Sequence, residues 1–323
     1  MIDSPHTRDR WAAELAARAR AYWTPERTAE LARGKALRLP PAEAAVLLRA
    51  LGLLRQDASM PPPQVRKYFQ INHMVALLEP GLRELRARHP TIRLLDAGCG
   101  RSYLTLLIAW CAKHVWGHPL EVLGVDRNPA VVEESRRRTA LAELGEVVRF
   151  EAGTLEVLDV GAAWTRAFGG AAGDGVRAVH GVIALHACDT ATCDALALGI
   201  ALDAELIAVA PCCQAELARA WAVLAERGDA GAFAPIWGAP HLRRETAAEI
   251  TDAMRMLLVR AAGYEALAME LVPAEHTRKN TLIRAIKRGA AAADARAARA
   301  AYEALRVATG GAGITLAARL GSG

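Results

Sequence analysis

Short apolar runs alternate with helical patterns between residues 91 and 287 of this chain. Apolar runs of strand length lie at residues 92–96, 120–126, 147–151, 179–185, 205–210, 264–272 and 281–287. Stretches with helical spacing lie between them, most clearly at 129–144, 190–200 and 246–262. Such alternation is typical of a mostly parallel sheet with helices on both faces. We predict a doubly wound α/β fold with seven strands, the last two antiparallel to each other.

The flanking segments carry no strand signal. Helical spacing appears at residues 11–23, 26–36, 42–54, 65–78 and 81–88, and the run DASMPPP at 57–63 predicts a break because prolines interrupt helices. Residues 161–174 and 226–244 are predicted to be irregular connections. The expected organisation is a helical N-terminal module at 1–60, an α/β domain at 65–288 and an Ala-rich tail at 289–323. The N-terminal module would recognise the acceptor of the α/β domain.

The strongest local signal is the run LLDAGCGRSYL at residues 94–104, in which a strand ends at an acid and a Gly-x-Gly loop opens a helix. Glycines let a ligand approach the backbone, and a helix start offers unpaired N–H groups. A dinucleotide loop needs a third glycine where Tyr103 stands. Asp96 would repel a pyrophosphate and suits the ammonium group of S-adenosylmethionine (SAM). The alternative is a tight strand-to-helix turn without a ligand.

A second acid follows at the end of the next strand. The run VLGVD ends at Asp126, and an acid at this place can bind both ribose hydroxyls of an adenosine. The alternative is that Asp126 only caps the helix that begins near Pro129.

These residues make the chain similar to class I SAM-dependent methyltransferases over about residues 65–288. The runs RKYFQINH at 66–73, LHACDTAT at 185–192 and PCCQ at 211–214 resemble a bacterial subfamily whose eukaryotic relatives include a transfer-RNA 2′-O-methyltransferase and methyltransferase-like proteins. The resemblance implies a Rossmann-like fold, SAM as cofactor and a methyl transfer by SN2 displacement, without a metal. We predict cofactor contacts at Asp96, Gly98, Cys99, Gly100, Asp126, Arg127, Gly153, Thr154, Leu185 and His186.

Two positions depart from the broad family pattern. Ser102 replaces a glycine that is common at the end of the loop, and the turn after the third strand reads EAGT at 151–154 instead of holding an acid near the adenine. The adenine contact is therefore assigned to the backbone of Gly153 or Thr154, with Glu151 as the alternative.

The acceptor site is predicted at the ends of the fourth and fifth strands. His186 would act as a base, and Asp189 would orient it or act as the base itself. The alternatives are a histidine bonded to backbone and an N-cap on the helix from Thr190. Cys212 and Cys213 would line the pocket as small apolar groups, since their spacing matches no zinc pair.

The helix before the first strand is predicted to present Tyr68, Gln70 and His73 toward cofactor or acceptor. Arg66, Gln70 and His73 share one helical face, and Tyr68, Ile71 and Val75 share the other. A solvated face on a packing helix is the alternative for the first set. The basic run HTRKN at 276–280 could clamp an anion or lie solvated.

The composition of the chain places few limits on the class of the acceptor. The 323 residues are 53% hydrophobic and 23% charged, which excludes full-length disorder, and the net charge of +5 permits an anionic partner. No apolar run is long enough for a membrane span, so we expect a soluble, cytoplasmic enzyme with no membrane contact. RNA is the favoured acceptor, with a peptide side chain or a small metabolite as alternatives. A nicotinamide oxidoreductase and a non-catalytic interaction protein are the competing classes.

Overall fold

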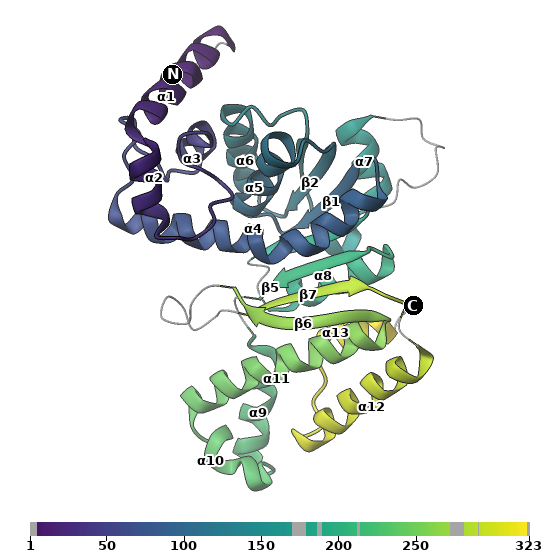
Figure 1. Cartoon of the computed structure of the whole chain (residues 1–323). Helices are drawn as coiled ribbons and strands as arrows, with labels where there is room; N and C mark the ends of the chain where they lie inside the picture. Colours follow the sequence, from purple (N-terminus) through teal and green to yellow (C-terminus); the bar gives the residue numbers. More distant parts are fainter. Residues whose placement is uncertain are drawn as a thin grey trace. The chain divides into compact units, whose positions relative to one another are not determined.

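The computed structural model describes residues 5–169, 179–185, 189–211, 214–271, 281–289 and 291–321. Its strands form one seven-stranded sheet in the order β3-β2-β1-β4-β5-β7-β6. The neighbours β5, β7 and β6 can be followed in this order in Figure 1. Pairing is parallel for β1 with β4, β2 with β3 and β4 with β5, whereas β7 runs antiparallel to β5 and β6. The predicted α/β sheet is therefore confirmed. Its strands are β1 (Ile92–Ala97), β2 (Leu120–Asp126), β3 (Val148–Ala152), β4 (Gly181–Leu185), β5 (Leu206–Ala210), β6 (Tyr264–Glu270) and β7 (Thr281–Lys287).

Helices precede, separate and follow the strands. They are α1 (Pro5–Tyr22), α2 (Pro25–Ala32), α3 (Ala45–Ala50), α4 (Pro62–Arg88), α5 (Tyr103–Cys111), α6 (Pro129–Leu141), α7 (Val160–Phe168), α8 (Thr190–Ala201), α9 (Glu216–Arg227), α10 (Ala234–Trp237), α11 (Pro240–Ala261), α12 (Ala292–Ala308) and α13 (Thr315–Gly321). Short turns of other helical types lie at Ala112–Trp116, Leu155–Val157 and Gly231–Phe233. Within the described part of the chain, no helix combines the length and the apolar character that crossing a bilayer requires.

The chain divides into two compact units. The first contains residues 1–93, 99–153 and 160–172, and the second contains residues 94–98, 154–159 and 173–323. The first unit thus holds α1 to α7 with β2 and β3, and the second holds β4 to β7 with α8 to α13. The predicted boundaries at 60, 65 and 288 remain sequence-based predictions.

Helix α4 differs from the sequence expectation in being continuous. Two helices were expected at 65–78 and 81–88, but α4 runs from Pro62 to Arg88 with Pro80 inside it. Proline removes a backbone donor and favours a helix end. The helix continues because its buried residues on both sides of Pro80, such as Leu78 and Leu82, pack against the core. The predicted break ends at Pro61, since Pro62 already lies in the first turn, where a missing N–H costs nothing.

Helix α7 replaces the irregular connection expected at 161–174. Val160, Ala163 and Trp164 are buried at helical spacing, and the Trp164 indole Nε1 donates to Glu121 on β2 over 2.9 Å. The sequence predicted a connection because glycines follow this apolar stripe near residue 170. Burial of the Trp164 indole stabilises the helix instead.

In the second unit, part of the loop expected at 226–244 is helical. Helix α10 ends at Trp237, and α11 begins at Pro240 instead of Thr246. The buried Trp237 ring stacks with both Phe233 and Trp221, and the ring centroids lie 5.1 Å apart in each pair. These aromatic contacts order a segment whose glycine and proline content alone predicts a loop.

The alanine-rich tail is docked through specific contacts. Tyr302 on α12 is fully buried, and the backbone N–H and hydroxyl of Thr315 both donate to the Glu216 carboxylate on α9. Helix α13 therefore begins at an anchored residue. The tail contributes to the core of the second unit.

Candidate active site

The loop after β1 turns through backbone conformations that glycine adopts easily. Gly98 and Gly100 have φ angles of 73° and 53°. Ser102, which precedes α5, has φ 55° and ψ 30°, in the left-handed region that few side-chain residues occupy. The residue that departs from the family pattern thus keeps the backbone conformation that a glycine would supply.

A chain of hydroxyl hydrogen bonds holds this loop to α6. The Ser102 hydroxyl, which is buried, donates to Ser135 Oγ over 2.9 Å, and the Ser135 hydroxyl donates to the Gly100 carbonyl over 3.1 Å. Because buried polar groups are costly without partners, this chain fixes the position of the Gly100 peptide. Sequence reasoning missed Ser135, which lies in an ordinary helical pattern.

Asp126 ends β2 with its carboxylate facing the glycine loop. Its Oδ2 accepts from the Gly100 N–H and its Oδ1 from the Asn128 N–H, each over 2.9 Å. The side chain is half-buried. An ionised carboxylate offers about four acceptor positions, so two remain for further donors. The alternative role as helix cap is wrong, because Asn128 caps α6 by accepting from the Ala130 N–H over 3.0 Å.

Close packing beneath the loop excludes side chains at Gly124. A Cβ there would lie 2.5 Å from the Phe150 ring and 3.2 Å from Cys99 Sγ. The Cys99 N–H donates to the Val125 carbonyl over 2.9 Å, and its side chain is buried. Cys99 therefore supports the loop from inside the first unit, and the prediction that it contacts a cofactor stays a prediction.

The other predicted cofactor residues differ in exposure. Asp96 on β1 is 2% exposed and Leu185, which ends β4, is also buried, whereas Arg127 and Thr154 are exposed. The Gly153 N–H donates to the Asp126 carbonyl oxygen over 3.0 Å. His186 lies outside the described residues.

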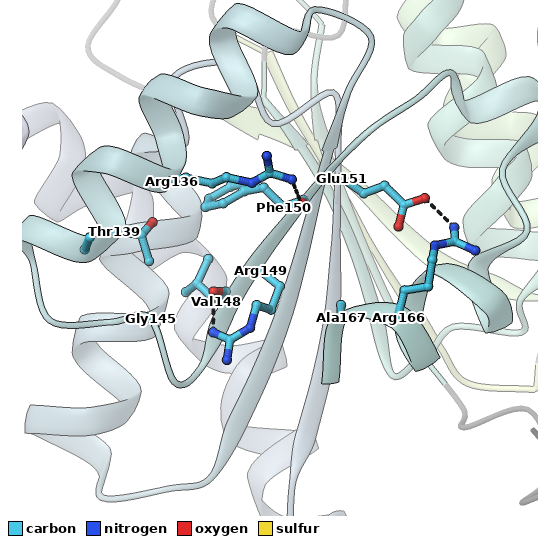
Figure 2. A pocket seen from close by; sticks show the side chains of 10 residues that line it. Arg136, Thr139, Gly145, Val148, Arg149, Phe150, Glu151, Arg166 and Ala167 are labelled. Atoms are coloured by element: carbon cyan, nitrogen blue, oxygen red, sulfur yellow. Dashed lines mark hydrogen bonds and ion pairs between the residues drawn. The ribbon is translucent and has the colours of Figure 1, made fainter. Parts of the chain in front are cut away.

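Figure 2 shows a groove of about 640 Å³ along β3, which is an edge strand of the sheet. Arg136 donates to the Phe150 carbonyl over 2.8 Å, and Arg149 donates to the Val148 carbonyl over 3.2 Å. Guanidinium groups thus cover carbonyls of the open strand edge, which would otherwise invite pairing with another strand. Glu151, the alternative adenine contact, forms an ion pair with Arg166 of α7 in this groove.

Asp189 follows β4 in a conformation that few side-chain residues adopt, with φ 51° and ψ −112°. Its Oδ1 accepts from the Ala215 N–H over 3.0 Å, and its Oδ2 accepts from Arg219 Nη2 over 2.9 Å. It stands at the N-cap position of α8, yet its side chain makes no capping bond. Asp189 therefore occupies the N-cap position of the alternative, but its carboxylate ties the segment after β4 to the start of α9 instead of capping α8.

A buried ion pair on α11 supports the same two segments. Arg255, which is fully buried, donates from Nη1 to Asp252 Oδ1 over 3.0 Å and from Nη2 to the Asp189 carbonyl over 2.8 Å. Asp252 Oδ2 accepts from Gln214 Nε2 over 2.8 Å. Burial raises the pKa of the Asp252 carboxyl to about 6, against the attraction of Arg255. One ion pair thus holds Asp189, after β4, and Gln214, after β5.

Sequence reasoning also missed Asp252 and Arg255, although a signal for them exists. Both were expected inside a helix, and Arg255 falls among residues 251, 254, 258 and 259 of its buried face. A charged residue within an apolar helical stripe requires a partner. Its ionic partner Asp252 lies three residues away on the same helix. The other contacts of the pair, with Gln214 and with the Asp189 carbonyl, join residues 38 and 66 positions apart, which local spacing does not identify.

The structure divides the predicted contacts of α4. Tyr68 is fully buried and its hydroxyl donates to the Leu39 carbonyl over 2.7 Å, so its side chain is committed to packing. Burial also raises the pKa of the Tyr68 phenol. His73 is exposed and Gln70 is half-buried, which confirms the expected division into two faces.

Cys212 and Cys213 lie outside the described residues, as does the basic run at 276–280. Across the parts of the chain that are described, the His, Cys, Asp and Glu side chains form no group of three suited to a metal ion. Cys99, Cys111 and Cys193 are buried.

Comparison with known proteins identifies the region that contains these motifs. Residues 66–220 match a protein family described as a methyltransferase domain. No curated protein matches the chain. Among solved structures, a geranyl diphosphate methyltransferase in complex with GPP and sinefungin is 15% identical, with 82% of this chain and 99% of that chain covered and a TM-score of 0.39. An SAH-bound methyltransferase of Podospora anserina is 12% identical, with 85% and 96% covered and a TM-score of 0.41.

The [4+2]-cyclase SpnF is 15% identical over 41% of this chain, with a TM-score of 0.30, and the chain spans 43% of its length. Likenesses this distant establish no activity for this chain. The family match covers the glycine loop, Asp126, Asp189 and the segment after β5. Over a little under half of its length, the chain is therefore similar to the methyltransferase domain family.

Proposed function

We propose that the chain is a SAM-dependent methyltransferase with RNA as its favoured acceptor. The observation that carries this proposal is Asp126, a half-buried carboxylate at the end of β2 held by the N–H groups of Gly100 and Asn128. The family match over residues 66–220 supports it independently.

The residues around Asp126 fit an adenosine. Two backbone N–H groups orient the carboxylate, and its two remaining acceptor positions suit the two hydroxyls of a ribose. The Ser102–Ser135 hydrogen bond keeps the loop in place without using the carboxylate. Asp96 is proposed to bind the ammonium group of the cofactor, together with backbone of Gly98.

SAM supplies a methyl group on a sulfonium, so its leaving group is already activated. The chain has to position the acceptor in line with that methyl and to exclude water. A base is needed only where the acceptor loses a proton. We assign that role to His186.

Asp189 is better suited to positioning than to proton transfer. Both of its carboxylate oxygens are engaged, one by the Ala215 N–H and the other by Arg219. Its segment is held further by Arg255 through the Asp189 carbonyl. Asp189 would therefore fix the segment that follows β4, next to His186.

The acceptor is assigned to RNA because the chain has a net charge of +5 and resembles a transfer-RNA methyltransferase. A peptide side chain and a small metabolite are the alternatives. Incubation with methyl-labelled SAM and a fractionated cell extract distinguishes the three, since label enters RNA, protein or small molecules.

Isothermal titration tests the cofactor assignment. Asp126→Ala is expected to lose SAM binding, whereas Asp9→Ala, which removes an exposed carboxylate on α1, should bind SAM like the wild type. Titration with NADH beside SAM tests the oxidoreductase alternative. Normal SAM affinity for Asp126→Ala, or binding of NADH instead of SAM, would contradict the proposal.

A further inference from the structure

A second groove, of about 540 Å³, lies wholly within the first unit. It is lined by the end of α1, by α2 and the segment after it, and by the first turns of α4. Figure 1 shows α2 beside the beginning of α4. The proposed function uses none of the residues that line this groove.

Cations dominate the charge of the groove. Arg27, Arg33, Lys35 and Arg66 line it, and Glu30 is the one carboxylate among its lining residues. Within the described part of the chain, none of these four cations forms an ion pair with a carboxylate. All four residues are exposed, so an anion can reach their charged groups.

The groove along β3 offers an instructive contrast. There, Arg166 pairs with Glu151, and Arg136 lies 3.5 Å from Glu133 and donates to a backbone carbonyl. The arginines of that groove are already bound to a carboxylate or to backbone. In the α1–α2–α4 groove, Arg27 Nη1 donates to the Tyr22 carbonyl over 3.1 Å, but no carboxylate neutralises the four cations.

Aromatic rings lie among these cations. The Arg27 guanidinium lies 4.5 Å from the centroid of the Tyr22 ring, and Lys35 Nζ lies 5.1 Å from that of Phe69. Both rings are half-buried, so each keeps part of its surface accessible. Trp23 anchors the wall, since its buried ring donates from Nε1 to the Ala58 carbonyl over 2.9 Å.

Cations interleaved with accessible aromatic rings match the chemistry of unpaired nucleic acid. Cations without a carboxylate partner bind the phosphates of a nucleic acid. Its unpaired bases stack on aromatic rings and guanidinium planes. An acidic peptide would bind to the cations but would offer no base to stack on the rings. A base-paired helix would present phosphates but no free base faces.

We propose that the groove formed by α1, α2 and the start of α4 binds an unpaired segment of RNA. The identification of that RNA as the acceptor rests on the proposed methyl transfer. The affinity of the groove for RNA is a separate property and is measurable without SAM.

The test measures fluorescence anisotropy of a labelled, single-stranded RNA of mixed sequence over a series of salt concentrations. Lys35→Gln/Arg66→Gln removes two unpaired charges, and Phe69→Leu removes a ring while keeping an apolar side chain. Arg83→Gln/Arg296→Gln, which neutralises two exposed arginines outside the groove, is the matched control. Unchanged SAM affinity in each variant shows that the fold is intact.

The variant Lys35→Gln/Arg66→Gln should bind RNA about tenfold more weakly than the wild type. The slope of log affinity against log salt should fall by about 1.4, because each of the two lost phosphate contacts contributes about 0.7 in single strands. Phe69→Leu should weaken binding about fivefold or more with little change in slope. The control should match the wild type. Equal losses in groove and control variants, or none in either, would overturn the proposal.

Competition separates the alternative occupants. Unlabelled single-stranded RNA should displace the probe at far lower concentration than a matched RNA duplex or polyglutamate of equal charge. Equal displacement by polyglutamate would overturn the proposal in favour of an acidic peptide. Equal displacement by the duplex would overturn it too, because the groove would then bind RNA without base stacking on its aromatic rings.

Failure of the groove and failure of the proposed function give different results. Asp126→Ala should retain RNA affinity while losing SAM. If the groove variants methylate RNA at wild-type rates, the groove does not bind the acceptor RNA, and the proposed methyltransferase activity stands. RNA binding that depends on the groove, without any methyl transfer to RNA, would leave the groove intact and overturn the assigned acceptor.

Discussion

Replacing Arg255 with methionine tests the buried ion pair behind the strand-end segments. The guanidinium has no solvent exposure and the Asp252 side chain is 8% exposed, so water cannot replace the lost partner. Arg255→Met removes bonds of 3.0 Å to Asp252 and 2.8 Å to the Asp189 carbonyl. It leaves the buried Asp252 carboxylate with Gln214 as its hydrogen-bond partner. Breaking one side of such a pair costs about 3–5 kcal/mol of the free energy of unfolding.

The loss should depend on pH in a defined direction. The folded pKa of Asp252, about 6, lies above its ordinary value of 3.8, so the folded protein holds this proton more tightly than the unfolded chain does. Stability from this group is therefore greatest below the unfolded pKa and falls as pH rises toward the folded pKa. Removal of Arg255 strengthens the effect, because no cation then opposes the desolvation.

Urea unfolding followed by circular dichroism at about pH 5 and about pH 8 measures both effects. The deficit of Arg255→Met should be larger at the higher pH. The double variant Arg255→Met/Asp252→Leu should recover much of the stability, since it also removes the buried charge. A deficit below about 1 kcal/mol, or one that is equal at the two pH values, would refute the assignment of an ionised, structurally required pair.

Three further variants test the first unit. Ser135→Ala removes the link to the Gly100 carbonyl, so it should cost about 1 kcal/mol and weaken SAM binding several-fold in titration; unchanged SAM affinity would show that the loop holds itself. Tyr68→Phe removes the hydrogen bond to the Leu39 carbonyl, so thermal unfolding should show a loss of about 1 kcal/mol of stability. The KM for the acceptor should stay constant, and a raised KM would show that Tyr68 contacts the acceptor. Gly124→Val places a side chain against Phe150, so a loss of about 1–3 kcal/mol is expected in urea, with Gly145→Val, which meets open space, as the control; equal losses would contradict the close packing.

Local sequence patterns determined the strands and the position of Asp126 in this protein. Each strand lies within two residues of its predicted limits, because a buried parallel strand is a continuous apolar run and its ends are marked by acids, glycines or prolines. Asp126 was predicted at a strand end for the same reason. The left-handed backbone at Ser102 was not predicted, because serine rarely adopts it.

Only the tertiary structure decided the contacts between distant segments. Helix α4 continues through Pro80, and α7 replaces a predicted connection, because burial outweighs local propensity. The hydrogen bonds of Ser135 and of Arg255 join residues that are 35 and 66 positions apart. Hydrophobic periodicity predicts which face of a helix a residue lies on, but not which segment packs against that face. The same holds for the groove of α1, α2 and α4, since unpaired cations become visible only when every neighbouring carboxylate has been placed.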